Sequence, residues 1–264
     1  MPPPTPRFAI VMTVRNNARY IRQAMGSLFP ELGSDGEVVI VDALSSDGTT
    51  EILRELAREH PVRVIVEACT RGKGRHLGIL STGAPIVITQ VDADVSYQAG
   101  ALRTAIEEFE RRGRRGLMVA FGKYDSNPGT AKFFVWDRAF YLSTGGYEDR
   151  NLHDDMKIVR KVLTMGGAHR FFVDKIGVDL QELDGSHRNP PRGWALAREN
   201  IRIARVFHGD GWTFGTYLKF LWLTRRSVPR YLAAAPLALV AFLRKPLHLS
   251  PDQLNRMTPS GPSP

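Results

Sequence analysis

Short apolar runs alternate with segments of helical spacing through the first half of the chain. The apolar runs are rich in valine and isoleucine and occupy residues 8–14, 37–42, 62–66, 87–91 and 117–121. Apolar residues recur at helical spacing between the runs, over residues 20–28, 45–59, 76–81 and 99–112. Continuous apolar runs are typical of strands buried on both faces. Four alternations of strand and helix therefore predict an α/β fold with a parallel sheet and right-handed crossovers.

Polar side chains gather where these predicted strands end. Thr13, Asp42, the segment 71–75, Asp92 and Asp94 all lie at a strand's carboxyl end or follow directly from one. Ligands of open parallel sheets bind beyond the carboxyl ends of the strands. Several complementary polar residues at one edge therefore predict a ligand site there.

Asp92 and Asp94 are separated by one residue at the end of the fourth apolar run. In an extended chain, two such side chains share a face and lie about 6.6 Å apart along the strand. Two carboxylates at that spacing repel unless a positive charge lies between them. Hard oxygen ligands suit Mg²⁺ or Mn²⁺. The pair favours a site for a divalent cation and a sugar nucleotide; the alternative is a solvated Asp-rich turn.

The second half of the chain is less regular. Its pattern predicts strands over 133–136 and 170–173, a turn over 143–147, and helices over 154–166 and 194–207. The expected domain organisation is a disordered leader (1–6), a catalytic domain (7–210), a basic amphipathic helical segment (211–249) and a disordered tail (250–264).

Composition adds an expected partner and compartment. The 264 residues carry a net charge of +9, which indicates an anionic partner. The single cysteine, Cys69, permits no intramolecular disulfide and fits a reducing cytoplasmic compartment. The proline-rich start lacks the basic and apolar regions of a secretory signal.

The basic excess is concentrated near the end of the chain. Residues 211–251 contain no Asp or Glu but hold six Lys and Arg residues. The apolar run 231–243 is too short to span a bilayer. We expect one or two helices over 212–247 on the cytoplasmic face of the membrane, with Trp212, Tyr217 and Trp222 as an interfacial belt. A helical pair packed on the catalytic domain and a dimer interface are the alternatives.

Several short motifs occur together in one order along the chain. They are Met12-Thr13-Val14-Arg15-Asn16, Val39-Ile40-Val41-Asp42, Ser45-Ser46-Asp47-Gly48-Thr49, Arg71-Gly72-Lys73-Gly74, Val91-Asp92-Ala93-Asp94, Gly145-Gly146-Tyr147 and Asp154-Asp155 ahead of Arg160. From residue 8 to residue 172 the chain resembles a family 2 glycosyltransferase of the GT-A fold. The resemblance implies a mostly parallel, Rossmann-like sheet flanked by helices, here with a C-terminal helical appendage. It also implies transfer of a sugar from a nucleotide donor with inversion at the anomeric carbon.

The resemblance assigns a donor half of the site. Asp42 would bind the nucleotide base, Asp92 would contact the ribose or base, and Asp94 would coordinate a metal that stabilises the leaving diphosphate. Arg71 and Lys73 would supply positive charge near that diphosphate, and the glycines beside them would let the backbone approach it. The nucleotide-sugar site implied in this way comprises Thr13, Val14, Arg15, Asn16, Asp42, Arg71, Lys73 and Asp92.

The resemblance also assigns an acceptor half. Inversion needs a general base that deprotonates the acceptor hydroxyl. Asp155 is the candidate base, and Asp154 would position it or contact the acceptor. Capping of the next helix is the alternative for this pair. His187 would complete the shell of the metal (Asp92, Asp94 and His187) or contact the diphosphate; a structural or exposed histidine is the alternative.

The chain departs from the family pattern at several places, including Asn17 in place of a common Glu and Asp154-Asp155 in place of the usual Glu-Asp pair. Ala43 and Leu44 stand where the family often has Asp-Gly, and only Arg192-Gly193-Trp194 remains of the Gln-x-x-Arg-Trp segment of processive synthases. A single-addition enzyme is therefore expected, with a glycan or lipid-linked acceptor. Two other functions stay open, a sugar-phosphate nucleotidyltransferase and a non-enzymatic basic module that binds membrane or nucleic acid. Basic residues interleave with aromatic ones mainly in the tail, which does not suit base stacking.

Overall fold

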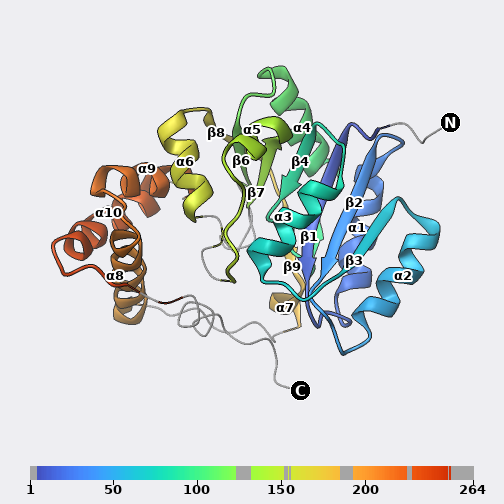
Figure 1. The fold of residues 1–264 in the computed structure, drawn as a ribbon, viewed down its shortest axis with the longest axis horizontal. Helices are drawn as coiled ribbons and strands as arrows, with labels where there is room; N and C mark the ends of the chain where they lie inside the picture. Colours follow the sequence, from blue (N-terminus) through green and yellow to red (C-terminus); the bar gives the residue numbers. More distant parts are fainter. Residues whose placement is uncertain are drawn as a thin grey trace.

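A seven-stranded sheet forms the centre of the molecule (Figure 1). A computed structural model describes residues 5–122, 132–151, 154, 156–184, 193–224, 228–248 and 250. The sheet has the order β3-β2-β1-β4-β7-β6-β8. Its strands are β1 (Phe8–Val14), β2 (Gly36–Asp42), β3 (Val62–Val66), β4 (Ile86–Thr89), β6 (Leu117–Gly122), β7 (Lys132–Asp137) and β8 (Ala168–Val173). A second, two-stranded sheet pairs β5 (Val95–Tyr97) with β9 (Gly177–Asp179).

The helices occupy most of the remaining described chain. They are α1 (Ile21–Leu32), α2 (Thr49–Glu59), α3 (Arg71–Ser81), α4 (Ala101–Arg111), α5 (Arg138–Ser143), α6 (Met156–Met165), α7 (Leu180–Leu183), α8 (Gly193–Gly209), α9 (Phe214–Thr224) and α10 (Val228–Phe242). Strands β1 to β4 are mutually parallel, and β7 runs antiparallel between β4 and β6. The predicted mostly parallel sheet is confirmed. In register, Val14 pairs with Asp42 and Asp42 with Val66, so these strands end at one edge.

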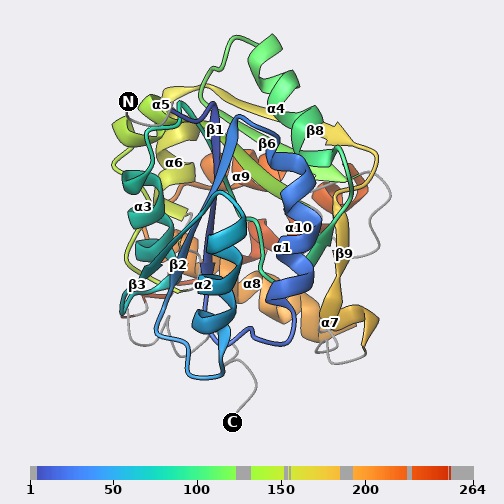
Figure 2. The ribbon, with the colours of Figure 1, turned by 90° about the vertical axis from the view of Figure 1, so that its right-hand side faces the viewer.

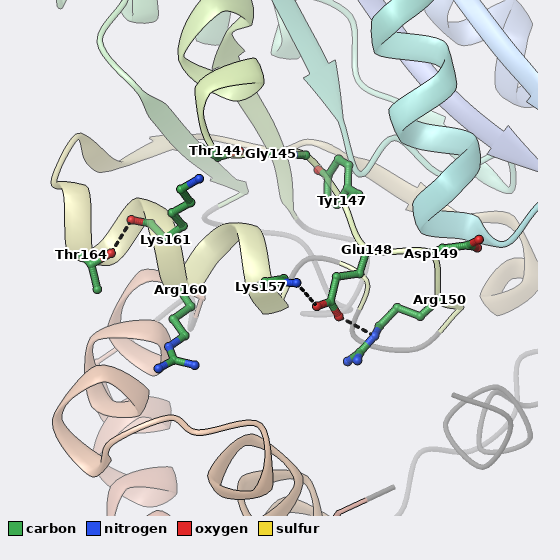
Figure 3. A pocket seen from close by; sticks show the side chains of 11 residues that line it. Thr144, Gly145, Tyr147, Glu148, Asp149, Arg150, Lys157, Arg160, Lys161 and Thr164 are labelled. Atoms are coloured by element: carbon green, nitrogen blue, oxygen red, sulfur yellow. Dashed lines mark hydrogen bonds and ion pairs between the residues drawn. The ribbon is translucent and has the colours of Figure 1, made fainter. Parts of the chain in front are cut away.

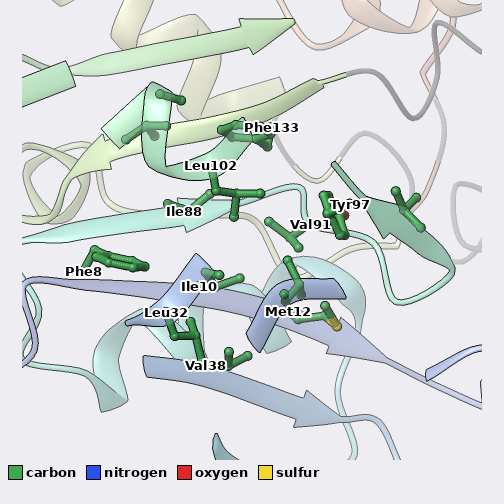
Figure 4. Close-up of a cluster of buried hydrophobic side chains, with 14 of the residues drawn as sticks. Phe8, Ile10, Met12, Leu32, Val38, Ile88, Val91, Tyr97, Leu102 and Phe133 are labelled. Carbon is green, nitrogen blue, oxygen red and sulfur yellow. The ribbon is translucent and has the colours of Figure 1, made fainter. Parts of the chain in front are cut away.

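The alternation of strand residues separates two apolar layers. Phe8, Ile10 and Met12 of β1 face a cluster that includes α1, α2 and α4 (Figure 4). Ala9 and Val11 face the other cluster, which includes α3, α5, α6 and the C-terminal helices. Figure 2 shows α1 and α2 in front of the sheet, with α8–α10 behind it. Burial on both faces is why the strands appear in the sequence as continuous apolar runs.

Two predicted elements have different boundaries. The fourth run is not one strand, because β4 ends at Thr89 and the next residue, Gln90, has a φ of 63°. Asp92 and Asp94 therefore lie in the connection between β4 and β5, outside any strand. The helix expected over 76–81 begins earlier, at Arg71, because the Thr70 side chain caps it by accepting from the Lys73 amide at 3.3 Å.

The C-terminal helices pack on the rest of the protein. Trp212 and Tyr217 are each 3% exposed and join a cluster with α6, so the expectation that they form an interfacial belt is wrong; Trp222 is exposed. One or two helices are expected over 212–247, and the structure has two there, α9 and α10, which pack on each other and on α8. Over the described residues, no helix is both long and apolar enough to cross a bilayer. Residues 1–4 and 251–264, within the predicted leader and tail, lie outside the described residues.

Candidate functional site

Two loops at the carboxyl edge of the sheet are joined by hydrogen bonds. In the β1–α1 loop, the amide of Asn16 donates to the Ser45 hydroxyl at 2.9 Å, and the Asn16 side chain accepts from the Ser46 amide at 2.9 Å. The Asn17 amide donates to the Thr49 hydroxyl at 2.7 Å. The predicted nucleotide residues 13–16 and the segment 45–49 therefore form one continuous ledge beside the sheet.

Asp42 stabilises this ledge through hydrogen bonds to the segment that follows β2. Its side chain is fully buried, and its carboxylate accepts from the amide of Ser45 at 3.0 Å, from the Ser45 hydroxyl at 2.6 Å, and from the Thr50 hydroxyl. Leu44, two residues after Asp42, has a φ of 57° and is 53% exposed. A positive φ is costly for a leucine, so the loop holds an exposed apolar side chain in a strained conformation at the rim of the site.

Asp92 and Asp94 are brought to one side by the burial of their neighbours. Val91, Ala93 and Val95 are buried in the core, so the two intervening aspartates turn away from it and are only half-buried. The Asp92 amide donates to the Tyr97 hydroxyl at 2.7 Å, which closes the turn. The two carboxylates therefore share a side although the segment is not a strand.

A third carboxylate approaches from the second sheet. Asp179 of β9, which is paired with Val95, is 5% exposed and acts electrostatically on both Asp92 and Asp94. Gln181 follows it and donates its side-chain amide to Asp94 Oδ2 at 2.7 Å. Burial, followed by repulsion from Asp92 and Asp179, raises the pKa of Asp94 to about 6. Burial also raises the pKa of Asp92, although Arg75 and Arg71 oppose that increase.

The chemistry of Asp92 and Asp94 fits a hard divalent cation. Both offer carboxylate oxygens, and burial together with repulsion from Asp92 and Asp179 raises the pKa of Asp94, an effect that a bound cation would offset. Within the described part of the chain, no three His, Cys, Asp or Glu side chains are grouped as a complete metal cage. Mg²⁺ and Mn²⁺ at phosphate sites commonly use one or two carboxylates, with phosphate oxygens and water as the other ligands. Two carboxylates therefore suit an ion that is held jointly with a diphosphate.

The basic motif 71–75 forms the first turn of α3 and serves packing as well as charge. The amides of Arg71 and Gly72 donate to Asn151 Oδ1 at 2.9 Å and to the Arg150 carbonyl at 3.0 Å, so they are already satisfied. A Cβ at Gly72 would overlap the Glu148 carbonyl oxygen, and this glycine therefore admits the segment 148–151. The expected approach of a ligand to the glycine backbone is not what Gly72 provides.

The side chains of this turn differ in their surroundings. Lys73 forms an ion pair with Glu67 at 3.1 Å, and that hydrogen bond raises the pKa of Lys73. Arg71 is exposed and acts electrostatically on both Asp92 and Asp94. Arg71 is therefore the better placed of the two cations for a ligand that the aspartates hold.

Arg75 joins the Asp92 side of the site to the Asp154 side. It is 5% exposed and forms an ion pair with Asp154, and its guanidinium lies 5.8 Å from the centre of the Tyr147 ring. Burial alone would lower the pKa of Arg75, but Asp154 and Asp92 raise it above its ordinary value. The Tyr147 hydroxyl in turn lies 2.6 Å from the Thr89 hydroxyl at the end of β4.

The structure describes Asp154, one of the residues predicted for the acceptor half of the site. Asp154 is 5% exposed and tied to Arg75, which suits a positioning role better than direct contact with a ligand. Asp155 and His187 lie outside the described residues.

A pocket of about 860 Å³ lies beside Tyr147. One wall is the segment 144–150 and the other is α6, whose Lys157, Arg160 and Lys161 line it (Figure 3). Lys157 pairs with Glu148 at 3.4 Å, whereas Arg160 donates to the Asp210 carbonyl at 2.9 Å and Lys161 to the Ser143 carbonyl at 3.2 Å. Four cationic and two acidic side chains line the pocket, so it favours an anionic group.

Comparison with known proteins decides the family. The family model described as Glycosyl transferase family 2 matches residues 9–177, well over half of the chain. The chain belongs to glycosyl transferase family 2. An uncharacterized glycosyltransferase, alr2836, of Nostoc sp. is 25% identical to it over 126 residues. That alignment covers 47% of this chain and 39% of the relative, so the chain spans well under half the length of this curated family relative.

Solved glycosyltransferases show the fold of this family 2 chain. PcManGT, a mannosyltransferase from Pyrobaculum calidifontis in complex with GDP-Man and Mn²⁺, aligns with a TM-score of 0.58 at 20% identity, over 91% of this chain and 75% of PcManGT. Residues 1–349 of S. aureus TarS align with a TM-score of 0.57 at 14% identity, over 90% of this chain and 70% of that structure. TarS has also been solved with UDP-GlcNAc. The predicted GT-A fold and family are confirmed, which favours a glycosyltransferase over the two alternatives from the sequence.

Three residues of this candidate site are not predicted by the sequence. Arg75 was counted only as part of a basic segment, although it is the buried cation between Asp92 and Asp154. Asp179 and Gln181 reach Asp94 from more than 80 positions away, through the pairing of β5 with β9. The arginine in the motif was a usable signal, whereas no local pattern marks Asp179 or Gln181.

Proposed function

We propose that the protein transfers one sugar from a nucleotide-diphosphate donor to an acceptor, with metal assistance and inversion. One observation carries the proposal. Asp92 and Asp94, both with raised pKa, lie beyond β4 beside the exposed Arg71 and the buried Arg75. A nucleotide diphosphate that binds together with a metal ion requires carboxylates that hold the metal and, next to them, a basic side chain that contacts the phosphates.

In this proposal the donor lies along the ledge of residues 13–16 and 45–49. Asp42 acts by holding the ledge in shape, and its contact with the nucleotide base stays a prediction. Asp94 and Asp92 would hold Mg²⁺ or Mn²⁺, with His187 as the third predicted ligand. When bound, the ion stabilises the charge that develops on the leaving diphosphate. Arg71 adds positive charge on the same side, and Gln181 orients the Asp94 carboxylate.

The acceptor half is proposed at the segment that follows Tyr147. Asp155 is the proposed general base, and Asp154, fixed by Arg75, positions it. The cationic pocket between 144–150 and α6 supports an acceptor that carries a phosphate next to its reacting group. With the basic excess of residues 211–251, this supports a lipid-linked glycan or glycolipid acceptor at the cytoplasmic membrane face.

The proposed base is tested by replacing Asp155 with Asn. We expect turnover to fall by about 10²–10⁴-fold, the usual contribution of a general base, while donor affinity stays within about twofold. Near wild-type turnover by Asp155→Asn, with donor binding intact, would remove the assignment.

The donor half is tested by thermal unfolding with UDP, GDP and dTDP, each with and without Mn²⁺. At about 100 times Kd, a nucleotide that binds only the folded state stabilises it by about 2.7 kcal/mol. We expect at least one nucleotide to raise the Tm, more strongly with Mn²⁺, and Asp94→Asn to remove the Mn²⁺ increment. Absence of stabilisation by any of the three nucleotides would contradict the proposal.

A further inference from the structure

Helix α10 presents an apolar stripe to solvent. Leu232, Leu239, Val240 and Leu243 are 60%, 47%, 40% and 79% exposed, and Pro236 between them is also exposed. Their spacing places all five within about 100° of arc on one side of the helix. The helix continues through Pro236, and the Leu243 amide donates to the Leu239 carbonyl at 3.0 Å, so the stripe extends one residue past the helix end at Phe242.

The packing of α10 is the reverse of what the hydrophobic effect favours for a helix in aqueous solution. Its inward side is made of Ala234, Ala238 and Ala241, which are at most 9% exposed, together with Phe242. The small alanines let α10 lie close against α8 and α9. A helix whose only partner is its own protein normally turns its leucines inward. The exposed leucines and Val240 of α10 are therefore directed at something other than this chain's core.

The position of α10 leaves this stripe accessible. Helices α8, α9 and α10 lie together at the end of the molecule opposite β3 and α2 (Figure 1). Arg244 and Lys245 follow the stripe directly and are both exposed. The sequence from 211 to 251 contains no Asp or Glu that would neutralise them.

We infer that the outward side of α10 is a docking surface for an anionic lipid membrane. A membrane surface supplies the two chemistries that the stripe and its flank match, an apolar interior for the leucines and anionic headgroups for Arg244 and Lys245. A second copy of the chain would bring the same cations against one another. The inference deepens the proposed membrane-side acceptor, because it names the surface that brings the enzyme to a lipid-linked substrate.

The test uses the full chain and sedimentation with vesicles. Wild-type protein is mixed with vesicles of 60% phosphatidylcholine and 40% phosphatidylglycerol, and with vesicles of phosphatidylcholine alone. We expect preferential binding to the anionic vesicles. We expect at least a tenfold lower partition coefficient for Leu239→Ser/Leu243→Ser, because two apolar side chains no longer enter the bilayer. Arg244→Gln/Lys245→Gln should lose about tenfold on anionic vesicles and little on neutral ones.

Leu80→Ser is the matched control, because Leu80 is 49% exposed on α3, away from this helical unit. It should bind vesicles like the wild type. Circular dichroism and hydrolysis of a soluble sugar nucleotide should be the same in all variants, so failed docking is distinguishable from failed catalysis. Unchanged vesicle binding by Leu239→Ser/Leu243→Ser would overturn the inference. A wild-type dimer that the same variant converts to monomer, without vesicle binding by either, would show that a second copy covers the surface.

Discussion

At the scale of single residues, the candidate site depends on charges that are compensated across the sequence. Arg75 is surrounded by Asp154 and Asp92, and Asp94 is held by Gln181 while it is repelled by Asp92 and Asp179. Burial makes each of these interactions stronger than it would be at the surface. The site therefore responds to the loss of a single charge and to pH.

Replacing Arg75 with Met should destabilise the fold strongly. The substitution leaves Asp154 buried without its partner, and breaking one side of a buried ion pair costs about 3–5 kcal/mol. Urea unfolding measures the effect. Lys73→Met, two residues earlier in α3, is the matched control, because its ion pair with Glu67 is exposed and should contribute about 1 kcal/mol or less. Equal losses in the two variants would contradict the bridging role of Arg75.

Stabilisation by Mn²⁺ should depend on pH through Asp94. The metal binds the ionised carboxylate, so protons compete with it as the pH falls through about 6. We expect a clear Mn²⁺-induced increase in Tm at pH 7.5 and a much smaller one at pH 5.0.

In the absence of metal, the contribution of Asp94 to the free energy of unfolding should show the opposite dependence on pH. The pKa of Asp94 is raised from 3.8 to about 6 on folding, so the folded state binds more protons than the unfolded state in that window. The ionised Asp94 carboxylate therefore lowers the free energy of unfolding above pH 6, and this loss of stability disappears as the pH falls toward 4. Asp94→Asn should remove both effects, and an Mn²⁺ increment that does not change with pH would count against Asp94 as a ligand.

At the scale of elements, glycines in α3 set how closely neighbouring segments approach. Gly72 faces the Glu148 carbonyl, and Gly78 faces Val11 of β1. These contacts hold α3 against both the sheet, at Gly78, and the segment that leads to Asp154, at Gly72. The α3 motif thus positions the acceptor half as well as supplying charge to the donor half.

Gly72→Ala should therefore destabilise the protein by about 1–3 kcal/mol, the usual cost of an overpacked site. Gly26→Ala in α1 is the control, because nothing lies within 4 Å of its added Cβ. That change should stabilise by about 0.5–1 kcal/mol through helix propensity. Chemical denaturation measures both, and a stabilising Gly72→Ala would refute the close-approach account.

The elements also show what the sequence could predict. Apolar runs located β1, β2 and β6 because both faces of these strands are buried, and they located the edge strand β3 through its partly buried valines and isoleucine. The end of β4 at Thr89 depends on a positive φ at Gln90, a residue type that gives no such signal. The antiparallel insertion of β7, and the arrival of Asp179 beside Asp94, depend on pairing between distant segments. Periodicity describes local burial and cannot carry that information.

At the scale of the whole molecule, a GT-A sheet and a C-terminal helical unit form one packed body. The ring of Phe207 in α8 lies 4.8 Å from that of Trp212 and 5.0 Å from that of Tyr217, centroid to centroid, and the three continue the core beyond α6. Composition alone suggested that the aromatic residues of this unit face a membrane. The structure buries two of the three, and the exposed apolar stripe of this unit lies on α10 instead.

We propose that Asp92 and Asp94 hold a metal and a nucleotide sugar for transfer. The most direct measurement is hydrolysis of a panel of UDP-, GDP- and dTDP-sugars, with Mn²⁺ and with EDTA, by wild-type protein and by Asp94→Asn. We predict that at least one donor is hydrolysed with Mn²⁺, that EDTA abolishes this activity, and that Asp94→Asn lowers it at least 100-fold, within the range for loss of an electrostatic catalytic group. Hydrolysis of none of the donors, or equal hydrolysis by Asp94→Asn, would contradict the account.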